Sequence, residues 1–375
     1  MAFLEKLEIS GFRSVRKAEL EIRPVNVMIG ANGAGKSNLV SFFEMLNASV
    51  WGETGLQNYI IRLGGASRLL HYGPKRTRDI FSHLHFRAND GLIEYAINLT
   101  DGGEDSLIFM FEIVNVLKDG TIQPDSIRST GHRQSFLSKF RLRNSVIRQQ
   151  PIEAAQLDVQ HFLKNCRIYH FNDTTPESPL RRRSGMDETT YLRADGGNLP
   201  AYLFYLQENF ADSYRRIVQT LQQLLPWFEG FYLEPEKDSL VLRCHAAGHT
   251  EYPLTVGQIS DGSLRLMALV TLLRQPAERR PQLIILDEPE LGLHPAAEAT
   301  IARLIQGVAA ENGQVLVATQ SATFLSNFEP EDVVVVENEG GESKFTRHTS
   351  AELADWLKRY SLGEVWQKNL IGGRP

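Results

Sequence analysis

The sequence predicts an α/β fold: a mixed or parallel sheet covered by helices, with an additional antiparallel β-subdomain. Three observations support this prediction. A glycine-rich loop at residues 30–37 joins a short apolar stretch to a stretch with helical spacing of apolar residues. Two later apolar stretches, 283–286 and 314–318, have the length of buried parallel strands. Between 80 and 114, three β-rich stretches are separated by turn residues, which favours antiparallel pairing.

The loop at residues 30–37 matches the phosphate-binding pattern G-x-x-x-x-G-K-[ST] at every fixed position. Its glycines let the backbone bring N–H groups close to phosphate oxygens. Lys36 is then expected to contact the β- and γ-phosphates of ATP, and Ser37 to place its hydroxyl on Mg²⁺. An accidental glycine-rich turn is the alternative. The expected nucleotide contacts in this segment are Gly30, Asn32, Gly33, Gly35, Lys36, Ser37 and Asn38.

The segments around the loop are those of a P-loop NTPase, which disfavours the accidental turn. Residues 25–29 form a short apolar run that predicts a buried strand, and 37–46 predict a helix. A helix that starts at the loop points its positive N-terminal end at the phosphates. Upstream, 3–10 and 18–22 alternate in polarity and predict an antiparallel pair of half-buried strands.

The amino-acid composition excludes several classes of protein. The chain has 375 residues, of which 42% are hydrophobic, enough for one large domain or two smaller ones. Its net charge of −5 excludes a protein that coats nucleic acid through overall charge, so any DNA contact should be a local patch. Two cysteines make no disulfide framework and suit a reducing cytosol. With no signal-peptide pattern and no apolar run as long as a membrane span, we expect a cytoplasmic protein without a membrane partner.

The apolar run at 283–286 ends in two adjacent carboxylates, Asp287 and Glu288. In a P-loop fold, the carboxyl edge of the sheet carries the chemistry. Asp287 is expected to hold Mg²⁺ through water, and Glu288 to polarise the water that attacks ATP. An ordinary strand terminus is the alternative, and the presence of the loop at 30–37 in the same chain favours the catalytic interpretation.

Residues 260–263 read Ser-Asp-Gly-Ser and precede an apolar helical stretch. Together with the phosphate loop and the Phe-Arg-Ser turn at 12–14, they resemble the ABC-type ATPases of the SMC/RecF class. The resemblance implies that this signature loop holds the γ-phosphate of a nucleotide on another subunit, so that ATP joins a homodimer or higher homo-oligomer. Asp261 stands where the family usually has glycine, which puts a carboxylate near the site. The implied nucleotide contacts are Arg13, Ser260, Gly262 and Ser263; the alternatives are a surface arginine at a strand end and a serine-capped helix start.

A third buried strand is predicted at 314–318, followed by Thr-Gln-Ser. The family commonly has Thr-His-Ser there, with the histidine sensing the γ-phosphate. Gln320 can still hydrogen-bond the phosphate or the water, but it cannot become cationic, so we expect slower turnover. The loop at 291–294 resembles one that crosses between subunits, and His294 either touches the partner's site or caps the next helix. The family also places a glutamine between its lobes, and the sequence does not identify it here.

Residues 124–250 differ in character from the rest of the chain. Apolar residues recur every three or four positions from 199 to 225, which predicts one amphipathic helix with Asn198 as its N-cap. Residues 231–234 and 239–244 predict a strand pair. The predicted domains are a discontinuous ABC-type ATPase head, 1–123 and 251–375, and an inserted α+β lid or effector subdomain, 124–250.

Basic residues gather in this insertion, where they either contact DNA phosphates or form solvated loop charge. They are Arg141, Arg143, Arg148 and the run Arg181-Arg182-Arg183. His161, Cys166 and His170 fit no common zinc spacing and are expected to be structural.

Two segments, 169–173 and 356–375, resemble a group of bacterial stand-alone predicted ATPases related to the ATPase half of OLD-type proteins. This resemblance implies an AAA-type label and a role in anti-phage defence or DNA repair. The chain ends soon after Ser321, so a TOPRIM nuclease is not expected within it, and any nuclease should be a separate effector.

The predicted function is therefore that of an intracellular ATPase. Two copies would enclose two ATP molecules, closing on binding and reopening on hydrolysis, and the insertion would carry this motion to DNA or to a nuclease-like effector. One alternative is an ATP-switched DNA-binding or scaffold protein with little turnover. The other is a transporter ATPase, which the long insertion and the RecF-like start disfavour.

Overall fold

The computed structural model describes residues 2–374 except 89–90, 119–120, 123–126 and 141–150. The chain divides into two compact units. The first contains Met1–Arg167, Pro330–Arg359 and Val365–Pro375, and the second contains Ile168–Glu329 and Tyr360–Glu364. The division into a head and an insertion at 124–250 uses other boundaries and stays a prediction. Within the described ranges, no helix is both long and apolar enough to cross a membrane.

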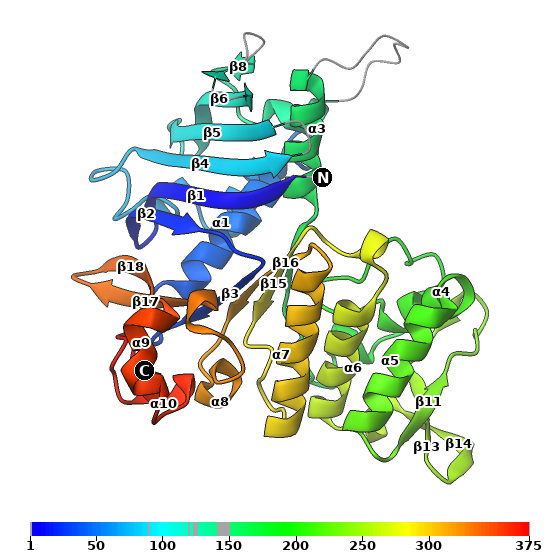
Figure 1. Cartoon of the computed structure of the whole chain (residues 1–375). Coiled ribbons are helices and arrows are strands. Elements are labelled where there is room, and N and C mark those ends of the chain that lie inside the picture. The colour runs from blue at the N-terminus through cyan, green and yellow to red at the C-terminus, as the bar shows by residue number, and fades with distance from the viewer. Residues whose placement is uncertain (1, 89–90, 119–120, 123–126, 141–150, 375) are drawn as a thin grey trace. The chain divides into compact units, whose positions relative to one another are not determined.

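An antiparallel sheet is the main feature of the first unit (Figure 1). Its strands follow the order β2 (Val15–Glu21), β1 (Phe3–Phe12), β4 (Asp79–Ala88), β5 (Gly91–Asp101) and β6 (Leu107–Lys118), and β7 (Thr121–Ile122) and β8 (Ile127–Ser129) also pair with β6. Side chains alternate along the strands, so that Leu7, Leu84 and Ile97 share the buried face. The predicted strands and their antiparallel pairing are confirmed.

Helices and a second group of strands complete the first unit. The helices are α1 (Lys36–Ser49), α2 (Gly55–Arg62), α3 (Pro151–Lys164) and α9 (Ser350–Leu357), with short 3₁₀ turns η1 (Ala66–Arg68), η2 (Phe136–Lys139) and η6 (Pro330–Asp332). β3 (Val25–Ile29) pairs in parallel with β17 (Val333–Glu339), which pairs antiparallel with β18 (Glu342–Arg347). Phe12 and Phe42 lie with ring centroids 5.3 Å apart, which packs α1 against β1.

The second unit contains a parallel strand pair covered by helices. β15 (Leu283–Asp287) runs parallel to β16 (Gln314–Ala318), as predicted, and their carboxyl ends meet at Asp287 and Ala318. Its helices are α4 (Leu199–Asn209), α5 (Ala211–Leu224), α6 (Asp261–Arg274), α7 (Pro295–Ala310) and α8 (Ala322–Leu325), with 3₁₀ turns η3 (Pro179–Arg181), η4 (Val256–Gln258) and η5 (Ala277–Arg279). α7 packs on β16, and α5, α6 and α7 pack in sequence against one another.

Small sheets and two boundary elements account for the remaining strands and helices. β11 (Phe228–Tyr232), β13 (Arg243–Ala246) and β14 (His249–Thr255) form one sheet, and β10 (Ser184–Gly185) pairs with β12 (Ser239–Leu240). The predicted pairing of 231–234 with 239–244 is thus correct for β13 only, because 239–240 pair elsewhere. β9 (Cys166–Tyr169) and α10 (Leu362–Gln367) contain positions where the chain passes from one unit to the other.

The single helix predicted over 199–225 is wrong, because the chain breaks at Phe210 into α4 and α5. Phe210 has φ −140° and ψ 54°, outside the helical region. The break lets α4 bury residues on most of its sides, whereas α5 buries one narrow face that includes Ile217 and Leu221. Asn198 precedes α4 but does not cap it with its side chain. Its amide accepts from the Arg193 N–H at 2.8 Å and so fixes the preceding loop.

Candidate nucleotide-binding site

The phosphate loop in the first unit connects β3 to α1. Gly30 and Gly35 have positive φ values of 154° and 119°. A Cβ at Gly30 would lie 2.1 Å from the Val336 carbonyl oxygen, and one at Gly35 would lie 2.0 Å from the Ser343 hydroxyl oxygen. Because β17 and β18 press so closely on the loop, only glycine fits these two positions.

Lys36 is the first residue of α1 and is 7% exposed. Its ammonium donates hydrogen bonds to the carbonyl oxygens of Gly30 and Ala31, which hold it against the loop. Ser37, Asn32 and Gly33 lie at the exposed surface of the same loop and helix start. The local geometry is therefore that of a loop with one buried cation behind exposed backbone and hydroxyl groups.

Arg13 lies beside α1, in the turn that follows β1, and its contact with a nucleotide stays a prediction. It has a positive φ of 48° and donates to the Ser41 hydroxyl at 3.0 Å and to the Asn38 side chain at 3.4 Å. Asn38 in turn donates to the Ser14 hydroxyl at 2.5 Å. The turn after β1 is thereby fixed against the first turns of α1.

Ser14 and Ser343 extend this connection to the phosphate loop itself. Their hydroxyls lie 2.6 Å apart, and Ser343 donates to the Ala34 carbonyl oxygen at 2.6 Å. Ser343 belongs to β18, more than 300 residues from the loop in sequence, and the sequence analysis missed it. No local pattern marks such a residue, whereas Ser14 could have been found from its place in the Phe-Arg-Ser turn.

Asp287 and Glu288 stand at the end of β15 in the second unit, as predicted. Glu288 has a positive φ of 47°, and its N–H donates to the Ala318 carbonyl oxygen at 2.8 Å. This turn places the Glu288 carboxylate where it accepts a hydrogen bond from the Gln320 side-chain amide. Asp287 lies with one carboxylate oxygen 3.7 Å from Nδ1 of His170. The structure therefore groups the three predicted residues Asp287, Glu288 and Gln320.

Glu290 is a buried acidic residue that the sequence analysis missed. It accepts hydrogen bonds from the Thr319 hydroxyl at 2.5 Å and from the Gln320 N–H at 3.3 Å. Burial raises the pKa of Glu290, although the Thr319 hydrogen bond opposes this shift. Its contacts fix the backbone that carries Gln320. The sequence feature that could have identified Glu290 is its position, because it is a third acidic residue two positions after Glu288.

The signature loop starts α6 with a serine cap. The Ser260 hydroxyl accepts from the Ser263 N–H at 3.3 Å, and the two serine hydroxyls lie 2.9 Å apart. Gly262 is closely packed, since a Cβ there would lie 2.8 Å from the Gly292 carbonyl oxygen. Arg265, one turn further along α6, donates to the Leu291 carbonyl oxygen at 2.8 Å. The loop at 291–294 is thus fixed beside the signature loop.

Asp261 is paired with Arg181 inside the second unit. The Arg181 guanidinium lies 2.6 Å from the Asp261 carboxylate and also donates to the carbonyl oxygens of Thr174 and Val256. The hydrogen bond from Arg181 lowers the pKa of Asp261 below its usual range. A cavity of about 580 Å³, lined in part by Asn172 and Asp261, opens beside this pair.

The remaining sequence candidates divide into those with internal partners and those outside the described residues. The His294 ring accepts from the Ala296 N–H at 3.3 Å, so in this chain it caps α7. Arg183 pairs with Glu236 at 2.6 Å. Arg141, Arg143 and Arg148 lie outside the described residues. His161, Cys166 and His170 are not grouped as metal ligands within the described part of the chain.

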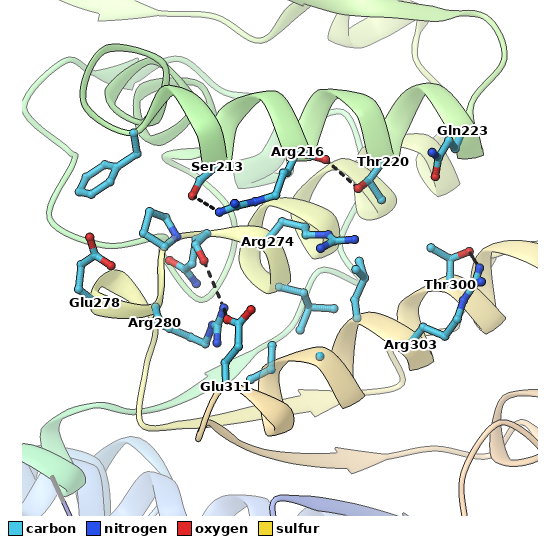
Figure 2. A pocket seen from close by; sticks show the side chains of 18 residues that line it. Ser213, Arg216, Thr220, Gln223, Arg274, Glu278, Arg280, Thr300, Arg303 and Glu311 are labelled. Atoms are coloured by element: carbon cyan, nitrogen blue, oxygen red, sulfur yellow. Dashed lines mark hydrogen bonds and ion pairs between the residues drawn. The ribbon is translucent and has the colours of Figure 1, made fainter.

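A second cavity, of about 570 Å³, lies among α5, α6, η5 and α7 (Figure 2). Its lining carries four arginines and two glutamates: Arg216, Arg274, Arg280, Arg303, Glu278 and Glu311. Figure 2 shows these side chains around a common space. The Arg280 guanidinium donates to the Glu311 carboxylate at 2.9 Å. No local sequence pattern reveals this cluster, because its members are spread over almost 100 residues.

The predicted site residues therefore form two groups, one in each unit. The phosphate loop and Arg13 belong to the first group. The second group contains Glu288 with Asp287 and Gln320, and also the signature loop. That the two groups meet at one nucleotide stays a prediction.

A protein-family model and a curated relative each match part of this chain. A family model described as "AAA_21: AAA domain, putative AbiEii toxin, Type IV TA system" matches residues 25–326. The DNA replication and repair protein RecF of Acidothermus cellulolyticus is 40% identical over 70 residues, which are 18% of this chain and 19% of that protein. The chain thus matches about a fifth of the length of this curated relative.

Two solved structures share the fold over almost the whole chain. One is an Smc head bound to the C-winged helix domain of ScpA, with a TM-score of 0.61 and 17% identity, covering 94% of this chain and 99% of that one. The other is an Smc head domain with an extended coiled coil, bound to the C-terminal domain of ScpA derived from Pyrococcus furiosus. Its TM-score is 0.59 at 16% identity, covering 96% and 99%. The chain belongs to the AAA_21 family, and its fold is that of the SMC-head class of ABC-type P-loop ATPases.

Proposed function

We propose that the protein binds ATP with Mg²⁺ and hydrolyses it, and that two copies enclose two nucleotides. The observation that carries the proposal is the Glu288 carboxylate, which Gln320 holds at the end of β15 in a chain that also has a complete phosphate loop. A strand-end carboxylate with a positioned amide is suited to orient an attacking water. The rate of ATP hydrolysis by Glu288→Gln tests the proposal, because this variant should turn over far more slowly than the wild type.

Each group of residues has a distinct role in this proposal. Lys36 neutralises charge on the β- and γ-phosphates, and the glycine-rich backbone orients them. Ser37 and Asp287 offer hydroxyl and carboxylate oxygens, the donors that Mg²⁺ prefers, and Mg²⁺ when bound neutralises phosphate charge. Because the Gln320 amide donates to Glu288, its carbonyl oxygen remains available to accept from the attacking water.

The signature loop supplies the argument for a second protomer. A helix N-terminus with two serine hydroxyls, such as that of α6, favours a phosphate. Asp261 in the first turn works against this, because its carboxylate repels an anion. Arg181 offsets that charge at 2.6 Å, so the loop keeps its affinity for a γ-phosphate from the other copy. Arg181 is therefore a positioning residue in the proposed interface.

Replacing Arg181 with alanine is expected to weaken ATP-dependent dimerisation and lower turnover by about tenfold, because Asp261 is left unpaired near the γ-phosphate. The double variant Arg181→Ala/Asp261→Gly should regain most of this loss. Phosphate release and the molar mass in the presence of ATP measure both effects. Arg183→Ala, which breaks the pair with Glu236, is the matched control and should behave like wild type.

The double variant distinguishes two roles of Arg181, which are neutralising the Asp261 carboxylate and holding neighbouring backbone by hydrogen bonds. Arg181 also donates to the carbonyl oxygens of Thr174 and Val256, and a glycine at position 261 cannot replace those bonds. If the double variant folds but stays as impaired as Arg181→Ala, Arg181 acts through its hydrogen bonds to Thr174 and Val256 and not by neutralising Asp261.

The cavity among α5, α6 and α7 supports DNA as the partner that senses the nucleotide state. α6 begins at the signature loop and ends at Arg274, and α7 begins at the His294 cap and carries Arg303. The four arginines outnumber the two glutamates of the lining, which gives it a positive balance suited to DNA phosphates. The RecF relative is named for DNA replication and repair, which agrees with this partner.

Reversing two of these charges tests the DNA contact. Arg274→Glu/Arg303→Glu should lower the affinity for a duplex oligonucleotide at low salt by about tenfold or more, and should flatten the salt dependence. Fluorescence anisotropy over a salt series measures both quantities. Arg215→Glu, on α5 but outside the cavity lining, is the control. If Arg274→Glu/Arg303→Glu and Arg215→Glu bind the duplex equally well, DNA contacts another part of the protein. If the wild type does not bind DNA at low salt, DNA is not the partner.

A further inference from the structure

A cluster of two histidines and two carboxylates lies on one face of the antiparallel sheet in the first unit. Glu8 on β1 is paired in register with His83 on β4, and His85 on β4 is paired with Glu94 on β5. Side chains alternate along strands, so these four residues share the face opposite the apolar core residues Leu7 and Leu84. The residues of the proposed nucleotide site do not include them.

The distances within this cluster are close to those of a metal site. One ligand atom from each of Glu8, His83 and His85 can be chosen so that all three lie within 4.8 Å of one another. Nε2 of His85 lies 3.5 Å from a Glu8 carboxylate oxygen, and Nε2 of His83 lies 3.7 Å from a Glu94 carboxylate oxygen. The two imidazole centroids are 4.0 Å apart. Asn115 donates to Glu94 at 3.3 Å and so orients the fourth side chain.

The ring nitrogens that point into the cluster lack hydrogen bonds. Nε2 of His83 and Nε2 of His85 are both buried and have no hydrogen-bond partner among the described residues. Buried polar atoms in folded proteins are usually satisfied, so two such atoms side by side call for a ligand that interacts with lone pairs. A metal cation satisfies both atoms at once.

Lys6 is the ion-pair partner that a metal ion at Glu8 would displace. The Lys6 ammonium lies 2.9 Å from a Glu8 carboxylate oxygen and 2.6 Å from one of Glu19. It therefore keeps an ion-pair partner when Glu8 binds a metal ion.

We propose that Glu8, His83 and His85 bind a divalent transition metal ion, Zn²⁺ in the first place, with Glu94 as the fourth ligand. Two imidazoles with carboxylates match Zn²⁺, whereas Mg²⁺ prefers ligand sets made of oxygen alone. Ligand atoms in a tetrahedral zinc site lie about 3.3 Å apart, so the cluster needs to contract by up to about 1.5 Å, which side-chain rotation allows.

A metal ion at this place would join three strands next to the nucleotide loop. β1 carries Glu8 and leads directly into Arg13 and Ser14, which are hydrogen-bonded to α1. Zn²⁺ would therefore fix the strand from which this turn projects. This site is separate from the proposed Mg²⁺ residues, and its test needs neither ATP nor turnover.

Calorimetric titration of Zn²⁺ into the tag-free, chelator-treated protein tests the proposal. We expect one bound Zn²⁺ per chain, and a loss of affinity of about tenfold or more in each of His83→Ala, His85→Ala and Glu8→Gln. Co²⁺ at the same site should give the visible absorption bands of a tetrahedral complex in the wild type and not in His83→Ala/His85→Ala.

His348→Ala is the matched control. The His348 side chain is 27% exposed, like that of His85, and lies 3.5 Å from Glu352, but among the described residues it belongs to no group of potential metal ligands. The control should bind Zn²⁺ as the wild type does. Circular dichroism verifies folding, and Glu8→Gln carries the test if the double variant does not fold. Substoichiometric binding by wild type, or equal binding by wild type and folded cluster variants, would overturn the proposal.

Discussion

Glu288→Gln is expected to reduce ATP turnover by about 100-fold or more, while ATP binding remains close to that of the wild type. The substitution keeps the size of the side chain and removes the charge that would attract a proton from the attacking water. Asp287 and the phosphate loop stay intact, so the magnesium and phosphate contacts are preserved. Phosphate release under saturating ATP measures turnover, and calorimetry with ATP measures binding.

The same experiment decides between the enzyme and the ATP-switched scaffold. A scaffold needs nucleotide binding but little hydrolysis, so wild type and Glu288→Gln would then hydrolyse ATP equally slowly. Glu329→Gln, at an exposed position of the second unit, controls for the loss of a negative charge and should leave turnover unchanged. An ATP-dependent dimer that accumulates only in Glu288→Gln would further support hydrolysis as the step that separates the copies.

Sequence patterns predicted those parts of the fold that are determined locally. The apolar run at 25–29 is β3 to the residue, and the glycine loop is followed by α1 because its spacing and its glycines act over a few positions. The helix predicted over 199–225 failed for the complementary reason. Its apolar spacing continues through Phe210, and the break is caused by the different burial of α4 and α5, which depends on distant neighbours.

The candidate site shows the same division. Lys36, Asp287 and Glu288 were predicted because each belongs to a short motif with a chemical reason. Ser343 was not, because it reaches the loop from a distant strand, and no periodicity encodes a hydroxyl that bonds to the Ala34 carbonyl. The Arg181–Asp261 pair was missed for a related reason: the sequence pattern around Arg181 suggests a DNA contact or solvated loop charge, whereas in the fold Arg181 neutralises a carboxylate.

Lys36→Ala is expected to remove ATP-dependent stabilisation of the protein. A ligand at about 100 times its dissociation constant stabilises the folded state by about 2.7 kcal/mol. For a unit of this size, that raises the melting temperature by about 5 °C or more. Without the Lys36 ammonium, the phosphates lose their one buried counter-charge in the loop, and the shift should fall below about 1 °C, which is less than about a fifth of the wild-type shift. Differential scanning calorimetry with and without ATP and Mg²⁺ measures it.

Loss of the ATP shift reports on the Lys36 ammonium only if the phosphate loop keeps its shape in the variant. Lys36 donates to the carbonyl oxygens of Gly30 and Ala31, so its removal also takes two internal bonds from the loop. The loop has further supports, however, because Ser343 holds Ala34 and the close approach of β17 and β18 fixes Gly30 and Gly35. Lys36→Met, which keeps most of the stem, should therefore melt near the ligand-free wild type and still show no ATP shift. Lys17→Ala, on the exposed face of β2, should keep the full shift. An undiminished ATP shift in Lys36→Met would mean that the nucleotide binds elsewhere.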